Sequence, residues 1–285
     1  MQDYTKGYLI LAIVVAFVSM DVVTIRYTEM DGVSVAFWRN FGVFVCLFIS
    51  TLIIYRNKFI TYLSKMTRKE WLMSLLFGSS GAFFSIAVQL TSAVNVLLMY
   101  VLSPLLAVIM SYVFLKEKIS NMVKFCSVFV IGGTYYAYKD SFDAGLDWGI
   151  VFAFIFVLCN SAMSVVARSL KHIPGMIIIS IGCIFWSILT FAYQTPALPQ
   201  TTFASFNMLA NILIVAITYG GLFYASKLIT APEVNLMLIT ETFFGTLMAW
   251  IFLNDTPTYE SIIGGTVALI AVATNMIYTI KINKN

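Results

Sequence analysis

The sequence predicts an all-α integral membrane protein whose ten transmembrane helices form two inverted five-helix repeats. Three observations predict this fold class: the composition, the spacing of long apolar runs, and the placement of lysine and arginine. Of the 285 residues, 60% are hydrophobic and only 11% are charged, whereas soluble domains carry about 25% charged residues. So few charges cannot cover a soluble surface, and the chain is expected to lie in a lipid bilayer. The net charge of +4 therefore does not indicate a nucleic-acid partner.

Ten apolar runs follow one another along the chain. Each is close to the roughly 20 residues that an α-helix needs to cross a bilayer. Their length and their lack of strict alternation favour helices over strands, and short polar or Gly- and Pro-containing links separate them. The runs are 7–25, 33–55, 71–89, 93–115, 122–138, 148–167, 174–194, 206–225, 231–253 and 260–280.

Lysine and arginine are distributed unevenly between the loops, and cytoplasmic loops normally carry the excess. With the N-terminus inside, fourteen of the 17 basic residues lie inside, only Arg26 and Lys139 lie outside, and Arg39 lies within the second run. A missed or extra span would scramble this distribution, so it predicts an even number of spans with both termini cytoplasmic. The inside residues are Lys6, Arg56, Lys58, Lys65, Arg68, Lys69, Lys116, Lys118, Lys124, Arg168, Lys171, Lys227, Lys281 and Lys284.

The chain contains an internal repeat. The stretch at 231–255 has an echo 138 residues earlier, in which Glu241 falls on Ser103 and Asp255 falls on Glu117. Predicted helix 4 runs from outside to inside, whereas predicted helix 9 runs the other way. We therefore expect residues 1–140 and 141–285 to be two five-helix repeats with opposite orientations. Many secondary transporters have this architecture and bind their substrate near the bilayer midplane. A duplicated protein with another role is the alternative.

Three short motifs resemble a known family. They are AFWR at 36–39, LSPLL at 102–106 followed by FLKE at 114–117, and ETFF at 241–244 followed by FLND at 252–255. In this order and spacing, the chain resembles the drug/metabolite transporter superfamily, in its ten-helix EamA-like branch. The family usually has Glu-Pro in helix 9, but Thr242 stands at the proline position here. A proline kink in helix 9 is therefore not expected.

The resemblance implies a multi-pass carrier of the bacterial inner membrane that needs no cofactor. We accordingly expect secondary active or facilitative transport of a small organic metabolite, such as an amino acid or an amine, by alternating access. Export is the favoured direction, because family members mostly act in efflux. A coupled proton or an exchanged solute is the further partner. The resemblance also implies a central cavity lined chiefly by predicted helices 1, 3, 4, 6, 8 and 9.

An enzyme, an uptake carrier and an interaction subunit are the alternative functions. The chain has no HExxH motif, no paired aspartate motif for a metal-bound diphosphate and no Walker A sequence, so an enzyme, a metal site and direct use of ATP are not expected. An uptake carrier for a nutrient or a nucleotide-derived metabolite remains an alternative. A membrane interaction subunit without transport activity is another.

Asp21 and Arg39 are the first candidate site residues. Asp21 lies about four residues before the end of predicted helix 1, and Arg39 about six residues after the start of predicted helix 2. At 1.5 Å per residue their depths differ by only about 3 Å, so the two can pair. One interpretation is a structural ion pair that tolerates burial because it is matched. The other is an outer gate, or a site for a zwitterion whose two ends compete for the pair.

Glu241 is the second candidate, because it lies about ten residues into predicted helix 9 and has no obvious basic partner at that depth. A charged side chain there costs on the order of 2.5–3.5 kcal/mol on insertion scales. It is expected either to bind a proton or a cationic group of the substrate, or to tie helix 9 to helix 4. Polar and aromatic residues at similar depths either line a pocket or join helices by hydrogen bonds. Those named as site candidates are Ser103, Tyr100, Asn160, Tyr219 and Asn235.

Overall fold

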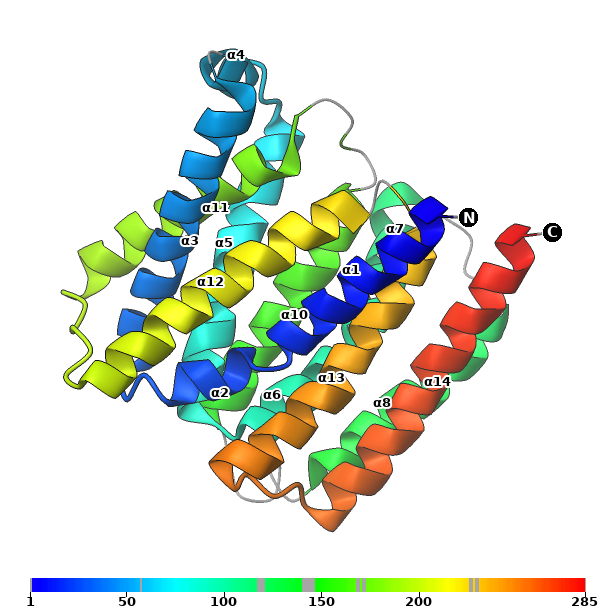
Figure 1. The fold of residues 1–285 in the computed structure, drawn as a ribbon. Helices are drawn as coiled ribbons and strands as arrows, with labels where there is room; N and C mark the ends of the chain where they lie inside the picture. The colour runs from blue at the N-terminus through cyan, green and yellow to red at the C-terminus, as the bar shows by residue number, and fades with distance from the viewer. Residues whose placement is uncertain are drawn as a thin grey trace.

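A computed structural model of the chain describes residues 2–56, 58–116, 121–139, 147–167, 170, 173–225, 228 and 231–284. All regular structure in these residues is α-helical (Figure 1). The first helices are α1 (Gln2–Val18), α2 (Asp21–Arg26), α3 (Gly32–Tyr55), α4 (Lys58–Ser64), α5 (Arg68–Leu90), α6 (Ala93–Tyr100) and α7 (Ser103–Leu115). They are followed by α8 (Asn121–Ala137), α10 (Trp148–Ala167), α11 (Gly175–Tyr193), α12 (Thr202–Ala225), α13 (Ala231–Leu253) and α14 (Tyr259–Lys284).

The helices have the length and hydropathy of a multi-pass membrane protein. Within the described residues, eight segments are long and apolar enough to cross a membrane, and two of these join a pair of consecutive helices, α1 with α2 and α6 with α7. A shorter apolar helix is counted at Thr240–Leu253, and α8 has 17 residues. The predicted all-helical membrane fold is therefore confirmed. The total of ten spans stays a prediction, although each predicted apolar run coincides with a helix or a broken helix pair.

Two of the predicted spans are interrupted, which the apolar pattern did not indicate. Predicted helix 1 breaks between α1 and α2, where the Ser19 hydroxyl donates a hydrogen bond to the Val15 carbonyl oxygen at 2.7 Å. Predicted helix 4 breaks between α6 and α7, and Pro104 stands in the first turn of α7. Proline is favoured there because its missing N–H needs no partner. By contrast, α13 runs without interruption through Thr242, as the absence of proline predicts.

The most extensive helix contacts join the two predicted repeats. Helix α5 packs against α10, α8 against α14, α3 against α11, and α1 against α12. One hydrophobic core contains side chains from both repeats, among them Val22, Val88, Val157, Met208 and Ala249. The repeats are therefore not separate lobes, and a site in the middle of the bundle receives residues from both.

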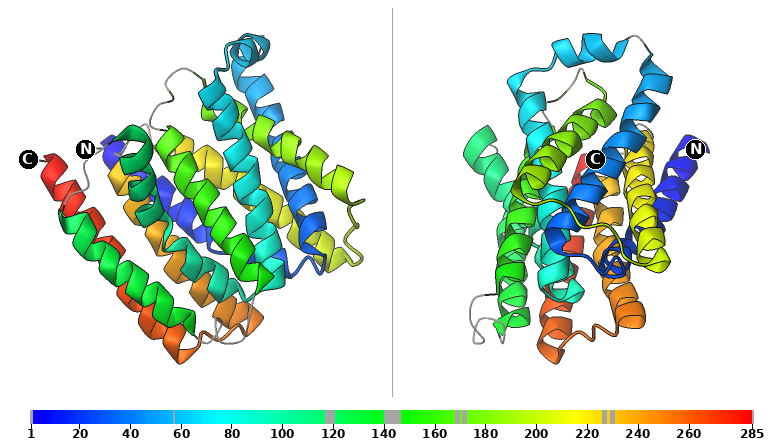
Figure 2. Two further views of the ribbon diagram at one scale, coloured as in Figure 1. Left: turned by 180° about the vertical axis from the view of Figure 1, so that it is seen from behind. Right: turned by 90° about the vertical axis from the view of Figure 1, so that its left-hand side faces the viewer.

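Helices α8 and α14 form a close pair at one edge of the bundle (Figure 2). A Cβ atom at Gly133 would lie 2.5 Å from the Gly264 carbonyl oxygen, and one at Gly264 would collide with the Gly133 carbonyl oxygen in turn. Small residues of this kind let two transmembrane helices approach closely. The contact is reciprocal, since each glycine faces the carbonyl oxygen of the other.

Both ends of the chain lie at the same end of the bundle, together with α4 (Figure 1). The starts of α6 and α14 lie at the opposite end. This agrees with the prediction that the two termini and the 56–70 segment share one side of the membrane. The charge distribution alone assigns that side to the cytoplasm, so the assignment stays a prediction.

Candidate functional site

Asp21 and Arg39 form a buried ion pair. Asp21 is the first residue of α2, directly after the break, and Arg39 lies in the first half of α3. Arg39 Nη1 donates to Asp21 Oδ1 at 3.0 Å, and Nη2 donates to Asp21 Oδ2 at 2.8 Å. Asp21 is 5% exposed and Arg39 is 7% exposed. The structure thus brings together the two residues whose depths matched. The Asp21–Arg39 pair is bidentate, which is the strong form of the arginine–carboxylate contact.

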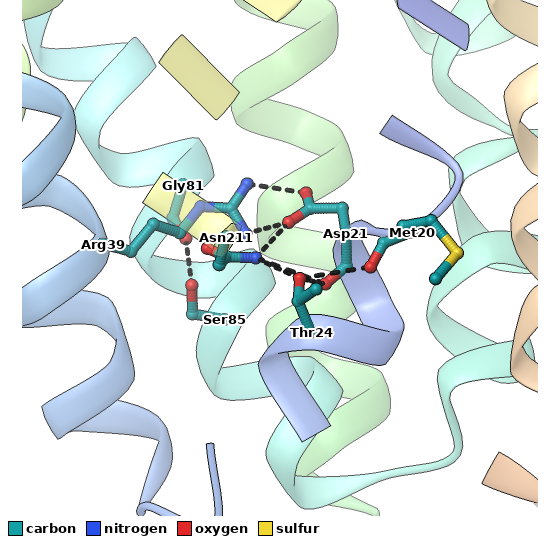
Figure 3. Close-up of polar contacts among 7 residues, drawn as sticks. All are labelled: Met20, Asp21, Thr24, Arg39, Gly81, Ser85 and Asn211. Atoms are coloured by element: carbon teal, nitrogen blue, oxygen red, sulfur yellow. Dashed lines mark hydrogen bonds and ion pairs between the residues drawn. The ribbon is translucent and has the colours of Figure 1, made fainter. Parts of the chain in front are cut away.

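Asn211 of α12 completes this ion pair, as Figure 3 shows. Its Nδ2 donates to Asp21 Oδ1 at 2.6 Å and to Thr24 Oγ1 at 2.9 Å, and the side chain is fully buried. Sequence reasoning missed Asn211. The signal was an amide inside an apolar run, where a polar side chain normally needs a partner.

An aromatic path leads from Arg39 into the centre of the bundle. The Arg39 guanidinium carbon lies 5.1 Å from the Phe84 ring centroid, a cation–π distance. The Phe84 and Phe156 centroids are 4.9 Å apart, and those of Phe156 and Tyr100 are 5.4 Å apart. The face of the guanidinium is therefore covered as well as its edge, and Tyr100 stands at the far end of the path.

Glu241 lies at the centre of a second polar group. Its carboxyl is close enough to Asp21, Arg39, Tyr100 and Tyr219 to interact electrostatically with each. Tyr100 also makes a side-chain hydrogen bond with Asn160 of α10. Glu241, Tyr100, Tyr219 and Asn160 are all half-buried, in contrast to the ion pair.

The half-buried group is not neutralised by a salt bridge. Among the described residues, the ion pair within 4.0 Å is the one between Arg39 and Asp21, and Glu241 has none.

Comparison with known proteins identifies the first repeat. Residues 5–138 match the model of the EamA-like transporter family. The first predicted repeat is therefore similar to the EamA-like transporter family. The resemblance seen in the sequence motifs is therefore confirmed. No curated protein matches the chain.

The likeness to solved structures extends over both halves of the chain. Eleven chains of solved structures match. One of them, described as "Crystal structure of protein", aligns over 95% of this chain and 97% of its own length with a TM-score of 0.66. The two sequences are 17% identical, so the likeness shows the fold alone. It covers both predicted repeats.

Ser103, in the first predicted repeat, accepts hydrogen bonds from a neighbouring helix. The Ser161 hydroxyl of α10 donates to the Ser103 carbonyl oxygen at 3.0 Å and to Ser103 Oγ at 3.3 Å, and Ser103 is buried. This contact favours the structural interpretation of Ser103. The side chain of Asn235, also named from the sequence, lies outside the described part of the structure.

Hydrogen bonds between helices also close the end of the bundle opposite the termini. The Arg26 guanidinium donates to the Thr91 carbonyl oxygen, and Thr91 Oγ1 donates to Asp147 Oδ2 at 2.6 Å. Gln89 Nε2 donates to the Ile25 carbonyl oxygen at 2.9 Å. These bonds tie α2, the end of α5 and the start of α10 together.

Proposed function

We propose that the protein is a secondary carrier that moves a small organic molecule across the bacterial inner membrane by alternating access. Similarity of the first repeat to the EamA-like family indicates a membrane transporter of small molecules. The observation that carries the finer proposal is the half-buried group of Glu241, Tyr100, Tyr219 and Asn160. These residues are the proposed substrate site.

The position of this group supports the proposal. Tyr100 ends α6 in the first repeat, whereas Asn160, Tyr219 and Glu241 lie on α10, α12 and α13 in the second. A site between repeats is where secondary transporters bind substrate, and interrupted helices are frequent there. Tyr100 directly precedes the break between α6 and α7. Motion of one repeat against the other would therefore change access to the site without dismantling it.

The Asp21–Arg39 pair is proposed as a structural support of this site. Both oxygens of Asp21 and both terminal nitrogens of Arg39 are engaged, and Asn211 adds a further donor. Using the pair to bind a substrate would require breaking these bonds in a buried place. The contacts therefore favour a structural pair over a gate.

Topology forms part of the proposal. We propose ten spans in two inverted repeats, with both termini in the cytoplasm and export as the direction of transport. The charge distribution and the placement of both chain ends at one end of the bundle support the orientation. A reporter fused after Asn285 that is active only in the periplasm would contradict both the topology and the inverted repeat.

Counterflow in proteoliposomes tests the carrier function. Vesicles containing the purified protein are loaded with an unlabelled solute, and transient accumulation of the labelled solute is measured across a panel of amines, amino acids and other metabolites. A carrier accumulates the label, whereas a channel, an enzyme or an interaction subunit does not. Glu241→Gln should abolish counterflow of the solute that the wild type moves. Glu29→Gln, the same change at an exposed position, is the matched control and should leave it intact.

A further inference from the structure

The link between α3 and α5 carries an excess of positive charge. Five basic residues lie within residues 56–69, whereas the chain has no acidic residue between Asp31 and Glu70. The five basic side chains are all exposed, and none of them forms an ion pair with the described residues. We call these five residues the basic link. They are Arg56, Lys58, Lys65, Arg68 and Lys69.

The start of α5 adds to this positive charge. Arg68 and Lys69 are the first two residues of α5, where the helix dipole is positive and favours anions. The next residue, Glu70, is buried, and its Oε2 accepts a hydrogen bond from the Thr67 amide at 2.8 Å in a capping box. Glu70 is therefore turned toward the backbone, and the exposed charge of the basic link is left for an anion from outside the chain.

Helix α4 lies crosswise between the ends of α3 and α5, as the right-hand view of Figure 2 shows. None of its residues is buried. The Phe59 ring packs on α3, with 5.3 Å between its centroid and that of Phe48. The Tyr62 and Tyr55 centroids are 5.7 Å apart, whereas Ile60 is exposed. An exposed apolar side chain on a helix with basic residues at both ends is typical of a helix that lies in the membrane interface.

The apolar side chains next to the basic link set its depth in the membrane. Ile53 and Ile54 near the end of α3 are exposed, as is Trp71 near the start of α5. In a membrane fold such aliphatic side chains face hydrocarbon, and tryptophan at the end of a span lies at the level of the headgroups. Arg56 comes two residues after Ile54, and Lys69 comes two residues before Trp71. The anion that meets the basic link at this depth is a lipid headgroup.

We infer that the basic link and α4 form a binding surface for the headgroups of anionic phospholipids, with the Ile60 side chain at the boundary of the acyl chains. Lysine and arginine near a membrane surface are attracted by anionic lipids, and a guanidinium can bind a phosphate through two N–H donors. The surface lies at the end of the bundle, away from the Glu241 group. The inference does not rest on the carrier function, and its failure would leave that proposal unchanged.

A comparison of lipids tests the inference on the wild-type protein, purified in a neutral detergent and freed of lipid. The probes are dioleoyl phosphatidylglycerol and dioleoyl phosphatidylcholine, which share acyl chains and differ in net charge. Kd is obtained from the rise in thermal midpoint with lipid concentration, because a ligand that binds the folded state raises it. Phosphatidylglycerol should bind at least about tenfold more tightly, and added salt should reduce the difference.

Inorganic phosphate and glycerol 3-phosphate distinguish a lipid surface from a site for a soluble anion. Neither should stabilise the protein at the concentrations at which phosphatidylglycerol does, because neither carries acyl chains into the interface. Equal affinity for the two lipids would overturn the inference. Equal stabilisation by a soluble phosphate would overturn it as well.

Variants assign the binding to this surface. A fourfold variant with glutamine at Lys58, Lys65, Arg68 and Lys69 should bind phosphatidylglycerol at least about tenfold more weakly than the wild type. The matched control removes the same number of charges at exposed lysines elsewhere, and it should bind like the wild type. It carries Lys6→Gln, Lys116→Gln, Lys124→Gln and Lys139→Gln.

Equal weakening in both fourfold variants would show an effect of net charge alone and would overturn the assignment. Wild-type affinity in the first variant would overturn it too. The double variant Lys58→Gln, Lys65→Gln leaves the capped start of α5 intact. It repeats the test, with an intermediate loss of affinity expected, if the fourfold variant does not fold.

Discussion

Asp21 and Glu241 are both carboxyl-bearing residues within apolar spans, yet their surroundings differ. Asp21 is buried and accepts two hydrogen bonds from Arg39 and one from Asn211. Glu241 is half-buried and forms no ion pair with the described side chains. One carboxyl has its partners within the described part of the chain, whereas the other has no ion-pair partner there.

The difference supports the proposal that Asp21 is a structural acid and that Glu241 binds the substrate. The Asp21 network joins α2, α3 and α12, and it places a fixed acid and a fixed aromatic path beside Glu241. Buried ion pairs cost desolvation, but removing one partner leaves an uncompensated charge. We therefore expect substitutions of Asp21 or Arg39 to lower mainly the stability of the fold. We expect substitution of Glu241 to weaken mainly ligand binding.

The largest loss of stability is expected from breaking the ion pair. Arg39→Gln or Asp21→Asn alone should lower the free energy of unfolding by about 3–5 kcal/mol, as for other buried pairs that lose one partner. The double variant should lose much less than the sum of the two, because neither charge is then left alone. Thermal unfolding in detergent across all four proteins measures the coupling. Purely additive losses would show that the pair is not energetically linked.

Asn211→Leu should have a smaller effect of the same kind. The substitution keeps the size of the side chain but removes the donor to Asp21 and Thr24. Interhelical hydrogen bonds in membranes average about 0.6 kcal/mol and reach about 1.7 kcal/mol, so a loss in this range is expected. The same substitution in an Asp21→Asn background should cost less. An equal loss in both backgrounds would mean that Asn211 acts independently of the pair.

Asp31 provides a third carboxylate, at a helix end outside the spans. Its Oδ1 accepts from the Val33 and Ser34 amides at 3.1 Å and 3.0 Å, and so caps α3. Partial burial acts to raise the pKa of Asp31, but the hydrogen bonds from Ser34 and Val33 outweigh it and lower the pKa below its ordinary value.

Asp31→Ala should cost about 0.5–1 kcal/mol near neutral pH, as loss of an N-cap does. Because the folded-state pKa is lowered, this stabilisation is present above the unfolded-state pKa and is lost as the pH falls through the folded value. The difference in thermal midpoint between wild type and variant should therefore shrink below about pH 4. A difference that is constant across pH would rule out the charged cap.

Glu241→Gln should change stability least, by less than about 0.5 kcal/mol, the range typical of substitutions that disturb no packing or network. Gln has nearly the same size, and it removes a charge that lacks an ion-pair partner. The protein should fold, insert and unfold with a wild-type midpoint while losing counterflow. A strong destabilisation would instead make Glu241 a structural tie between helices and would place it with Asp21.

The sequence predicted the helices more completely than the site. Each of the ten apolar runs lies on a helix or on a broken pair, because hydropathy over 20 residues directly reflects the cost of exposing backbone and side chains to lipid. The breaks after Val18 and Tyr100 were not predicted, since a local interruption leaves the apolar composition of a span unchanged. The continuous course of α13 was foreseeable, because Thr242 replaces the usual proline.

Depth along a span can be counted from the sequence, whereas rotation and packing cannot. Counting residues from the ends of the spans placed Asp21 and Arg39 at similar depths, which predicted an ion pair, and placed Glu241 near the middle of its span. It gave no reason to add Asn211, because an amide in an apolar run can face any of several helices. It left open whether Ser103 lines a pocket or joins helices by a hydrogen bond, and the structure shows a hydrogen bond from Ser161 of α10 to Ser103.

The sequence by itself determined that the chain is a helical membrane protein of EamA-like character with acids within its spans, and it predicted an internal repeat. These properties follow from composition, periodicity and motif order, which are local or additive along the chain. Only the tertiary structure decided that Asp21 is satisfied by Arg39 and Asn211 while Glu241 has no ion-pair partner among the described residues. The free energy of a buried charge depends on which groups lie within a few ångströms of it, and packing between helices far apart in sequence sets those distances.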